Sequence, residues 1–289
     1  MPHELGENPK HLGGGARAPT PMAHQITSAS NPQIKTLKGL HAKKGRAETG
    51  LFLAEGARLA LEAAELGVWP EILVYSVGAL ERPLVRNLID EAQARRLRVI
   101  ETSEGVLAQI SKRDNPQTVI GAYAQRLSPL AAIEGDTIVA LEGVRDPGNL
   151  GAILRTADAT GAAGIVLLGE SCDPFSVEAV RASMGSIFAT SIARASFTDL
   201  LALKQTRGAQ MIGASLKGGA FDADLSAPRR AILLMGNEQS GLPSDMENAC
   251  DLLVKLPMRG RADSLNLAVA TAVMLYDLWR RRGYDGARA

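Results

Sequence analysis

The sequence predicts an α/β protein made of two successive α/β segments, the second with a mainly parallel sheet. Short apolar runs alternate with amphipathic stretches of helix length along most of the 289 residues. This alternation breaks once, at segment 127–136, which we interpret as a linker. After the linker the strand-like runs are continuously apolar, as is typical of parallel strands buried on both faces.

The first α/β segment is expected between residues 26 and 126. Residues 1–25 are rich in Gly and Pro and carry little to bury, so a disordered tail is expected there. In chain order we then expect a helix at 31–45 with a basic end, a strand at 51–56, a helix at 57–67, a strand at 71–76, a helix at 82–97, a strand at 98–102, a short helix at 106–111 and a strand at 118–124.

The second α/β segment is expected between residues 137 and 289. Its expected strands lie at 137–144, 164–169, 187–193, 210–215, 231–236 and 252–257, and its helices at 150–161, 177–186, 200–208, 244–250 and from about 264 to 282. Strands that alternate with helices predict a parallel sheet covered on both faces. Such sheets bind ligands in loops at the carboxyl ends of their strands.

Composition excludes several classes of protein. The formal net charge is +1, so any basic surface must be local. Cys172 and Cys250 lie far apart and no apolar run reaches membrane-spanning length, which predicts a soluble, intracellular protein. All four histidines fall in the first 41 residues, so the second segment alone holds neither a Ser-His-Asp site nor a histidine-ligated metal.

The loop after the strand at 137–144 has two explanations. Asp146-Pro147-Gly148 is turn chemistry, and Asn149 can cap the helix that follows. Arg155 lies one helical turn beyond Gly151, on the same face. A well-capped helix with a surface arginine explains the pattern as well as a binding site does. The dinucleotide fingerprint and the Walker A spacing are both absent.

The loop after Met235 is polar and flexible, with Gly236, Asn237, Glu238 and Gly241. By itself it is best explained as an ordinary strand-to-helix turn. A carboxylate at the carboxyl end of a buried strand nevertheless favours a site.

The stretch 260–273, GRADSLNLAVATAV, joins a basic turn to a helix of small and apolar residues. Asp263 or Ser264 is expected to cap that helix. Asn266 would then lie inside the helix, where asparagine is a poor helix former. The helix is apolar around most of its surface, which indicates heavy packing, including against a second subunit.

A basic cluster near the N-terminus has two open explanations. Five cations occur within twelve residues that contain no acid: Lys35, Lys38, Lys43, Lys44 and Arg46. A solvated helix face is one explanation. Contact with the phosphates of a nucleic acid is the other.

Taken together, the three loops are more specific than any one of them. The ordered set N-x-G-x-x-x-R (149–155), G-N-E-x-x-G-L (236–242) and L-P-M-x-G-x-x-x-S-L-N (256–266) resembles the SpoU/TrmH family of RNA ribose 2′-O-methyltransferases, within the SPOUT superfamily. FLAEGARLALEA and NPQTVIGAY are similar to that family's N-terminal substrate-binding domain, which has an L30e-like fold.

The resemblance implies a fold, a cofactor and a partner. The C-terminal domain would contain a deep trefoil knot that binds S-adenosylmethionine, and no metal is required. The cofactor residues implied by motif position are Gly236, Asn237, Leu256, Met258, Gly260 and Leu265. The family is dimeric through its last helix, so a homodimer could complete each active site.

The resemblance also implies roles for the motif residues. Arg155 would anchor the phosphate of the target nucleotide and stabilise the 2′-alkoxide as it forms, because a guanidinium hardly loses its proton. The polar residues that would orient it, the ribose and the cofactor are Asn149, Glu238, Ser264 and Asn266. The basic cluster, with Arg145, would bind RNA. Gln239 stands where the family often has Gly, and Gly241 is expected to make the turn instead.

The expected function is therefore methyl transfer to a ribose 2′-hydroxyl of structured RNA in the cytoplasm. Ribosomal RNA is favoured over transfer RNA because of the two-domain layout. A transfer RNA enzyme, a non-catalytic RNA-binding protein and a small-molecule enzyme with a nucleotide cofactor remain alternatives.

Overall fold

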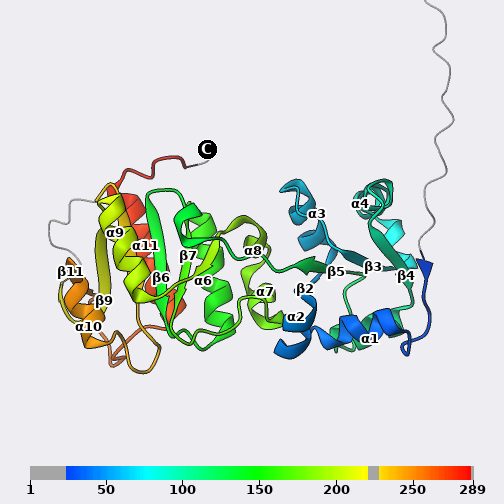
Figure 1. Ribbon diagram of the computed structural model, residues 1–289, viewed down its shortest axis with the longest axis horizontal. Coiled ribbons are helices and arrows are strands. Elements are labelled where there is room, and N and C mark those ends of the chain that lie inside the picture. Colours follow the sequence, from blue (N-terminus) through cyan, green and yellow to red (C-terminus); the bar gives the residue numbers. More distant parts are fainter. Residues whose placement is uncertain (1–23, 221–227, 288–289) are drawn as a thin grey trace, which may run out of the picture.

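The computed structural model describes residues 24–220 and 228–287, which form two lobes side by side (Figure 1). We call residues 24–126 the N-lobe and 137–287 the C-lobe. Residues 1–23 of the expected tail lie outside the described part. The tail expected at 1–25 is too long, because His24–Gln25 form strand β1, which pairs with a strand of the N-lobe.

The N-lobe is a five-stranded sheet of order β1-β4-β3-β5-β2, in which β5 runs antiparallel to both its neighbours. Its elements after β1 are α1 (Pro32–Gly39), α2 (Lys43–Thr49), β2 (Leu51–Glu55), α3 (Ala57–Glu65), β3 (Ile72–Ser76), η1 (Val77–Glu81), α4 (Pro83–Ala94), β4 (Arg98–Thr102), α5 (Glu104–Ser111) and β5 (Val119–Ala124). The single helix predicted at 31–45 is wrong, since the chain turns between α1 and α2.

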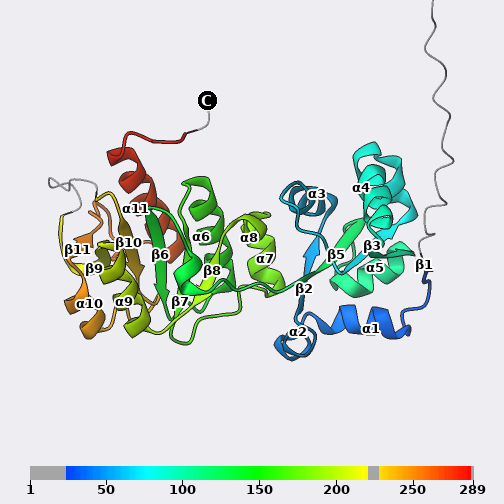
Figure 2. The same cartoon turned by 45° about the horizontal axis from the view of Figure 1, so that its top comes forward.

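Helices cover both faces of this sheet (Figure 2). Ile34 and Leu37 of α1 pack with Leu107 of α5 on one face. Leu88 of α4 packs with Ala60 of α3 on the other face. Burial of these apolar faces drives the lobe to fold.

The C-lobe is a six-stranded sheet of order β11-β9-β10-β6-β7-β8, and every pair in it is parallel, as predicted. Its elements, after the short η2 (Leu130–Ala132) of the linker, are β6 (Thr137–Glu142), α6 (Pro147–Ala159), β7 (Gly164–Leu168), α7 (Val177–Ser183), α8 (Ser186–Ala189), β8 (Ile192–Arg194), α9 (Phe197–Arg207), β9 (Gln210–Ala220), β10 (Ala231–Met235), α10 (Ser244–Ala249), β11 (Leu252–Lys255) and α11 (Leu267–Arg281).

One strand prediction in the C-lobe is wrong. Residues 187–193 were expected to be a strand, but the first part of that run belongs to α8 and only its end enters β8. The hydroxyl of Ser186, at the start of α8, donates to Asp158 Oδ2 at 2.7 Å. This contact with α6 fixes the turn of helix, and tertiary packing thereby overrides the local preference of the Ile and Thr residues for a strand.

Both faces of the C-lobe sheet are covered, as predicted. On central strand β6, Val139 and Leu141 face a core shared with α6 and α11. Ile138 and Ala140 face the opposite core, with α9 and α10. The knotted threading implied by the family resemblance stays a prediction.

The lobes meet through an aromatic cluster. Phe52 and Tyr123 of the N-lobe contact Phe175 and Phe188 of the C-lobe, with ring centroids 4.7–6.0 Å apart. Across the same junction Arg181 Nη2 lies 2.7 Å from Glu55 Oε1. The junction is therefore packed like a core.

Arg46 belongs to this junction, which corrects its expected role in RNA binding. Its residue exposure is only 4%. Its guanidinium pairs with Asp173 at 2.7 Å and donates to Leu40 O and His41 O. Buried and fully bonded, Arg46 ties α2 to the C-lobe and is not a surface cation.

No helix in the described ranges is long and apolar enough to cross a membrane.

Candidate functional site

The three loops singled out in the sequence converge at one edge of the C-lobe sheet. β6 and β10 are parallel neighbours, so the loops that follow them lie side by side. The start of α11 joins them. Together they enclose a site cavity of about 580 Å³, lined by Arg145, Asp146, Asn149, Asn237, Glu238, Gln239, Ser264, Leu265, Asn266 and Leu267.

Asp146, rather than Asn149, caps α6. The helix begins with Pro147, and Asp146 Oδ1 accepts from Asn149 N at 2.7 Å. The expected capping by Asn149 is wrong because the helix starts three residues earlier than predicted. The Asn149 side chain is therefore available to the cavity.

Asn266 caps α11, which corrects the expected caps Asp263 and Ser264. Its Oδ1 accepts from Ala268 N at 2.9 Å and from Val269 N at 3.3 Å. Its Nδ2 donates to Asn149 Oδ1 at 2.8 Å. The Asn266 side chain thus caps the helix that follows the third loop and also holds Asn149 of the first loop.

A row of three side chains results. Asn266 donates to Asn149, and Asn149 Nδ2 donates to Glu238 Oε1 at 3.1 Å. Glu238 Oε2 also accepts from Arg145 N at 3.4 Å. Because Asn266 must present its oxygen to the helix, every amide in the row has a fixed orientation. Such a row holds the Glu238 carboxylate in place at the cavity.

The loop from Gly236 to Gly241 is closed by its own backbone. Asn237 and Gly241 exchange both backbone hydrogen bonds, and Asn237 Nδ2 donates to Gly143 O at 2.6 Å. A Cβ on Gly236 would lie 2.2 Å from the Gly241 carbonyl carbon, so only glycine fits there. Gly241 takes the left-handed turn at φ 68°, as expected, and Gln239 is not among the residues with positive φ.

The structure brings together some of the predicted cofactor residues. Asn237 and Leu265 line the site cavity, and Gly236 directly precedes Asn237. Ser264 lines it too and is exposed. Leu256, Met258 and Gly260 are not part of its lining.

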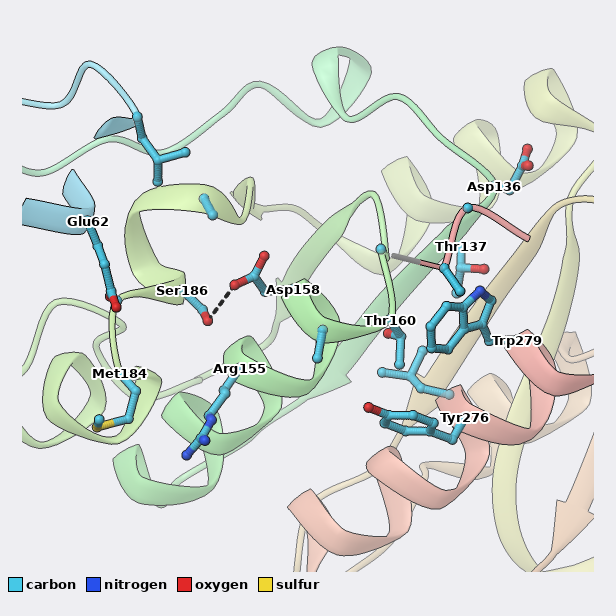
Figure 3. Close-up of a pocket in the computed structure, with 18 of the residues that line it drawn as sticks. Glu62, Asp136, Thr137, Arg155, Asp158, Thr160, Met184, Ser186, Tyr276 and Trp279 are labelled. Carbon is cyan, nitrogen blue, oxygen red and sulfur yellow. Dashed lines mark hydrogen bonds between the residues drawn. The ribbon is translucent and has the colours of Figure 1, made fainter. Parts of the chain in front are cut away.

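Arg155 lies in a different hollow. Arg155 lies six positions beyond Asn149, which is about 9 Å along a helix axis and on another side of the helix. It lines a cleft of about 1070 Å³ between α3, α6 and α11, which we call the α3–α11 cleft. In Figure 3 its side chain projects from α6, with Met184 to one side and Tyr276 of α11 to the other.

Cys172 is a neighbour of the site that the sequence reasoning missed. Burial raises the pKa of its thiol to about 11, and the charges of Glu238 and Asp146 add to the effect. Glu142 was missed as well. Burial, together with the charge of Asp245, raises the pKa of its carboxyl, whose buried Oε2 has no hydrogen-bond partner among the residues that the structure describes. The sequence did carry a signal for Glu142, because it is a charged residue at the end of an otherwise apolar strand.

The remaining predicted cations lie outside the cavity, except Arg145, which is exposed on its rim. Lys35, Lys43 and Lys44 are exposed, and Lys38 Nζ donates to Gln109 Oε1 at 3.1 Å. Within the described ranges, no group of three His, Cys, Asp or Glu side chains is arranged to hold a metal ion.

Comparison with known families matches both lobes. The family model described as the SpoU rRNA Methylase family matches residues 136–276. The model of the MRM3-like substrate binding domain matches residues 31–121.

Comparison with individual proteins agrees with these two family matches. A Bacillus subtilis protein named 23S rRNA (guanosine(2553)-2′-O)-methyltransferase RlmP is 32% identical, over 88% of this chain and 98% of its own. A Streptomyces viridochromogenes 23S rRNA (uridine(2479)-2′-O)-methyltransferase is also 32% identical, over 91% and 94%. The crystal structure of an AdoMet-bound rRNA methyltransferase from Sinorhizobium meliloti superposes with a TM-score of 0.82 at 46% identity, covering 89% of this chain and 98% of that one.

Proposed function

This chain belongs to the SpoU rRNA methylase family, and from that premise we propose that it methylates a ribose 2′-hydroxyl of ribosomal RNA. S-adenosylmethionine is the methyl donor of this family. The convergence of Asn149, Glu238 and Asn266 on one cavity carries the proposal, because it joins all three family motifs by hydrogen bonds.

The site cavity fits the cofactor in its charge. S-adenosylmethionine supplies a methyl group on a sulfonium, which is positive. The Asp146 and Glu238 carboxylates line the cavity and outnumber its one cation, Arg145. Leu265 and Asn237 would contact it from the third and second loops. Leu256, Met258 and Gly260, which the third family motif contributes, remain proposed contacts.

The residues of this chain act by positioning. The Asn266–Asn149–Glu238 row orients the ribose so that the 2′-oxygen is aligned with the methyl carbon, and alignment supplies much of the rate. Ser264, which lines the same cavity, helps to orient the ribose. The 2′-hydroxyl proton leaves through the target phosphate or water, and the Arg155 guanidinium stabilises the alkoxide that forms.

Arg155 reaches such a site from a second subunit. In one chain it lines the α3–α11 cleft rather than the site cavity. α11 carries an exposed apolar stripe at Val269, Val273 and Tyr276, one turn apart. A homodimer that buries this stripe would bring the partner's α6 to the cavity, and each active site would then contain residues of both chains.

We assign RNA binding to residues 26–126 and catalysis to 137–289, with 127–136 as the linker. The match of residues 31–121 to a substrate binding domain supports this division. Lys35, Lys38, Lys43 and Lys44, with Arg145, are the proposed RNA contacts of the cluster. An activity on ribosomal RNA supports a cytoplasmic location.

The test is methyl transfer by wild-type protein and by Arg155→Ala to ribosomal RNA from a strain that lacks the gene. We expect the variant to lose methylation while calorimetry shows S-adenosylmethionine binding largely kept. An undiminished rate in the variant would refute the role of Arg155. Mapping 2′-O-methyl marks in total RNA of the same strain separates ribosomal from transfer RNA targets, and wild-type protein that binds RNA without methylating it would support the non-catalytic alternative.

A further inference from the structure

A third cleft adjoins the site cavity where α2 faces the loops that follow β7 and β8. Figures 1 and 2 place α2 at the edge of the N-lobe that faces the C-lobe. This α2 cleft has a volume of about 650 Å³, and Lys43 lines one wall while Glu170 and Arg194 line the other. Arg145 lines both the α2 cleft and the site cavity, so the two hollows meet at that side chain.

The lining of the α2 cleft carries a net positive charge. Lys43, Arg145 and Arg194 are exposed, and none of them forms an ion pair with a carboxylate of the described residues. Asp173, the less exposed of the two acids in the lining, is neutralised by Arg46. Glu170 is the remaining carboxylate of the lining. An uncompensated set of cations attracts an anion whose charges are spaced along the same path.

The walls of this cleft are held at a fixed separation. At its base Arg46 joins α2 to Asp173 of the C-lobe at 2.7 Å. Gln125 Nε2 donates to Arg46 O and to Leu51 O, both at 2.9 Å, which ties α2 to the neighbouring strand. Arg194 Nη2 donates to Cys172 O at 3.0 Å, which restrains the guanidinium on the opposite wall. A preformed site loses less entropy when it binds.

We propose that the α2 cleft binds the single strand of RNA next to the target nucleotide, with Lys43, Arg145 and Arg194 contacting its phosphates. The inference rests on the proposed function and adds Arg194 and the path of the strand to it. A strand that leaves the ribose in the site cavity passes Arg145 and enters the α2 cleft. The guanidinium of Arg194 offers the planar pair of donors that suits a phosphate. A cleft of about 650 Å³ suits a few unpaired nucleotides, in keeping with the unpaired loops that RNA-binding proteins commonly recognise.

The test measures the affinity of ribosomal RNA from a strain that lacks the gene, over a range of salt concentrations. Each of Lys43→Ala and Arg194→Ala is expected to weaken binding by about three- to tenfold. Each should also make the negative slope of log K against log salt shallower by about 0.7, because one phosphate contact is lost. Glu170→Gln is expected to tighten binding, a gain that a merely destabilised protein would not show. Arg229→Ala, an exposed arginine of the C-lobe just before β10 that lines none of the three hollows, is the matched control and should bind as the wild type does. Calorimetry with S-adenosylmethionine should give the wild-type affinity for all four variants.

If Lys43→Ala and Arg194→Ala both bind RNA with the wild-type affinity and salt slope, the proposal that the RNA strand runs through the α2 cleft is overturned. If the same two variants also methylate RNA normally, the proposed function still stands. A loss of S-adenosylmethionine binding in Arg194→Ala would also overturn the proposed path of the strand, by making the α2 cleft part of the cofactor site. Variants that bind naked RNA normally but associate less with ribosomal particles would assign the cleft to a protein partner instead. If the wild type neither binds nor methylates this RNA, the proposed function itself fails.

Discussion

At the scale of single residues, Asn266 shows how capping and binding are served by one side chain. Its oxygen satisfies two backbone donors of α11, and its amide nitrogen holds Asn149. Three residues within four positions, Asp263, Ser264 and Asn266, have side chains that cap helices well. Local preference therefore could not select among them, whereas the family motif correctly indicated that Asn266 belongs with Asn149.

Substituting Asn266 separates its two roles. Asn266→Ala removes the cap and is expected to lower the free energy of unfolding by about 1 kcal/mol and to abolish most methyl transfer. Asn266→Asp keeps an oxygen for the helix but has no amide to donate to Asn149. We expect it to unfold in urea like the wild type and still to methylate RNA poorly. Wild-type activity of Asn266→Asp would show that the row does not orient the substrate.

Asp251, directly before β11, makes stability depend on pH. Burial alone would raise the pKa of its carboxyl, but bonds from Lys204 Nζ and Met211 N, with the charge of Lys204, outweigh burial and lower it. A lowered pKa stabilises the fold above the unfolded value of about 3.9, and this contribution is lost as the pH falls through the folded value. Wild type should therefore exceed Asp251→Asn in unfolding free energy at pH 7, and the gap should narrow below about pH 4. The exposed Asp114→Asn is the control, and a gap independent of pH would contradict the assignment.

At the scale of elements, Gly151 lets α6 approach α7. A Cβ there would lie 2.4 Å from Ala179 O and 2.5 Å from Ala182 Cβ. Gly151→Ala must push the helices apart, at a cost of about 1–3 kcal/mol. Since α6 also carries Asn149 and Arg155, methylation should fall further than stability. Urea unfolding and methyl-transfer rates measure the two effects. Gly39→Ala, whose Cβ would meet nothing within 4 Å, should be neutral or stabilising, and equal effects of the two substitutions would refute the packing argument.

Most elements of this fold follow from local sequence patterns, and the exceptions depend on contacts between distant residues. The parallel sheet of the C-lobe was predictable because its strands are continuously apolar. The turn of helix at α8 was not, since it depends on the bond between Ser186 and Asp158 of α6. Arg46 is a comparable case: its pattern resembles that of the neighbouring lysines, and only the fold shows that Asp173 lies beside it.

At the scale of the whole molecule, the Arg46–Asp173 pair fixes the lobes to each other. Asp173→Asn keeps the acceptor for Phe175 N but leaves a buried guanidinium without its counter-charge. We expect a loss of about 3 kcal/mol in unfolding free energy and weaker RNA methylation, with S-adenosylmethionine affinity unchanged. Glu48→Gln breaks the exposed pair with Lys44 and should change stability by less than about 0.5 kcal/mol. If Asp173→Asn proves as mild as this control, the junction depends on its aromatic cluster alone.

The proposed dimer makes a prediction that no single chain can satisfy. The proposed active site needs both Arg155 and Asn149, so Arg155→Ala and Asn149→Ala should each be inactive alone. The two side chains lie on different sides of α6, so one site can take them from different subunits. If Arg155 acts across the interface, a mixed dimer contains one cavity with intact Asn149 facing an intact Arg155 of the other chain. After subunit exchange, an equal mixture should therefore recover about a quarter of wild-type methylation, since half the dimers are mixed and one site in each is whole. Light scattering checks that both variants are dimeric, and Val273→Asp, in the exposed stripe of α11, should give inactive monomers. A mixture that stays inactive while exchange is complete would place Arg155 and Asn149 of the same chain in each site, and the cavity would then have to close within one subunit.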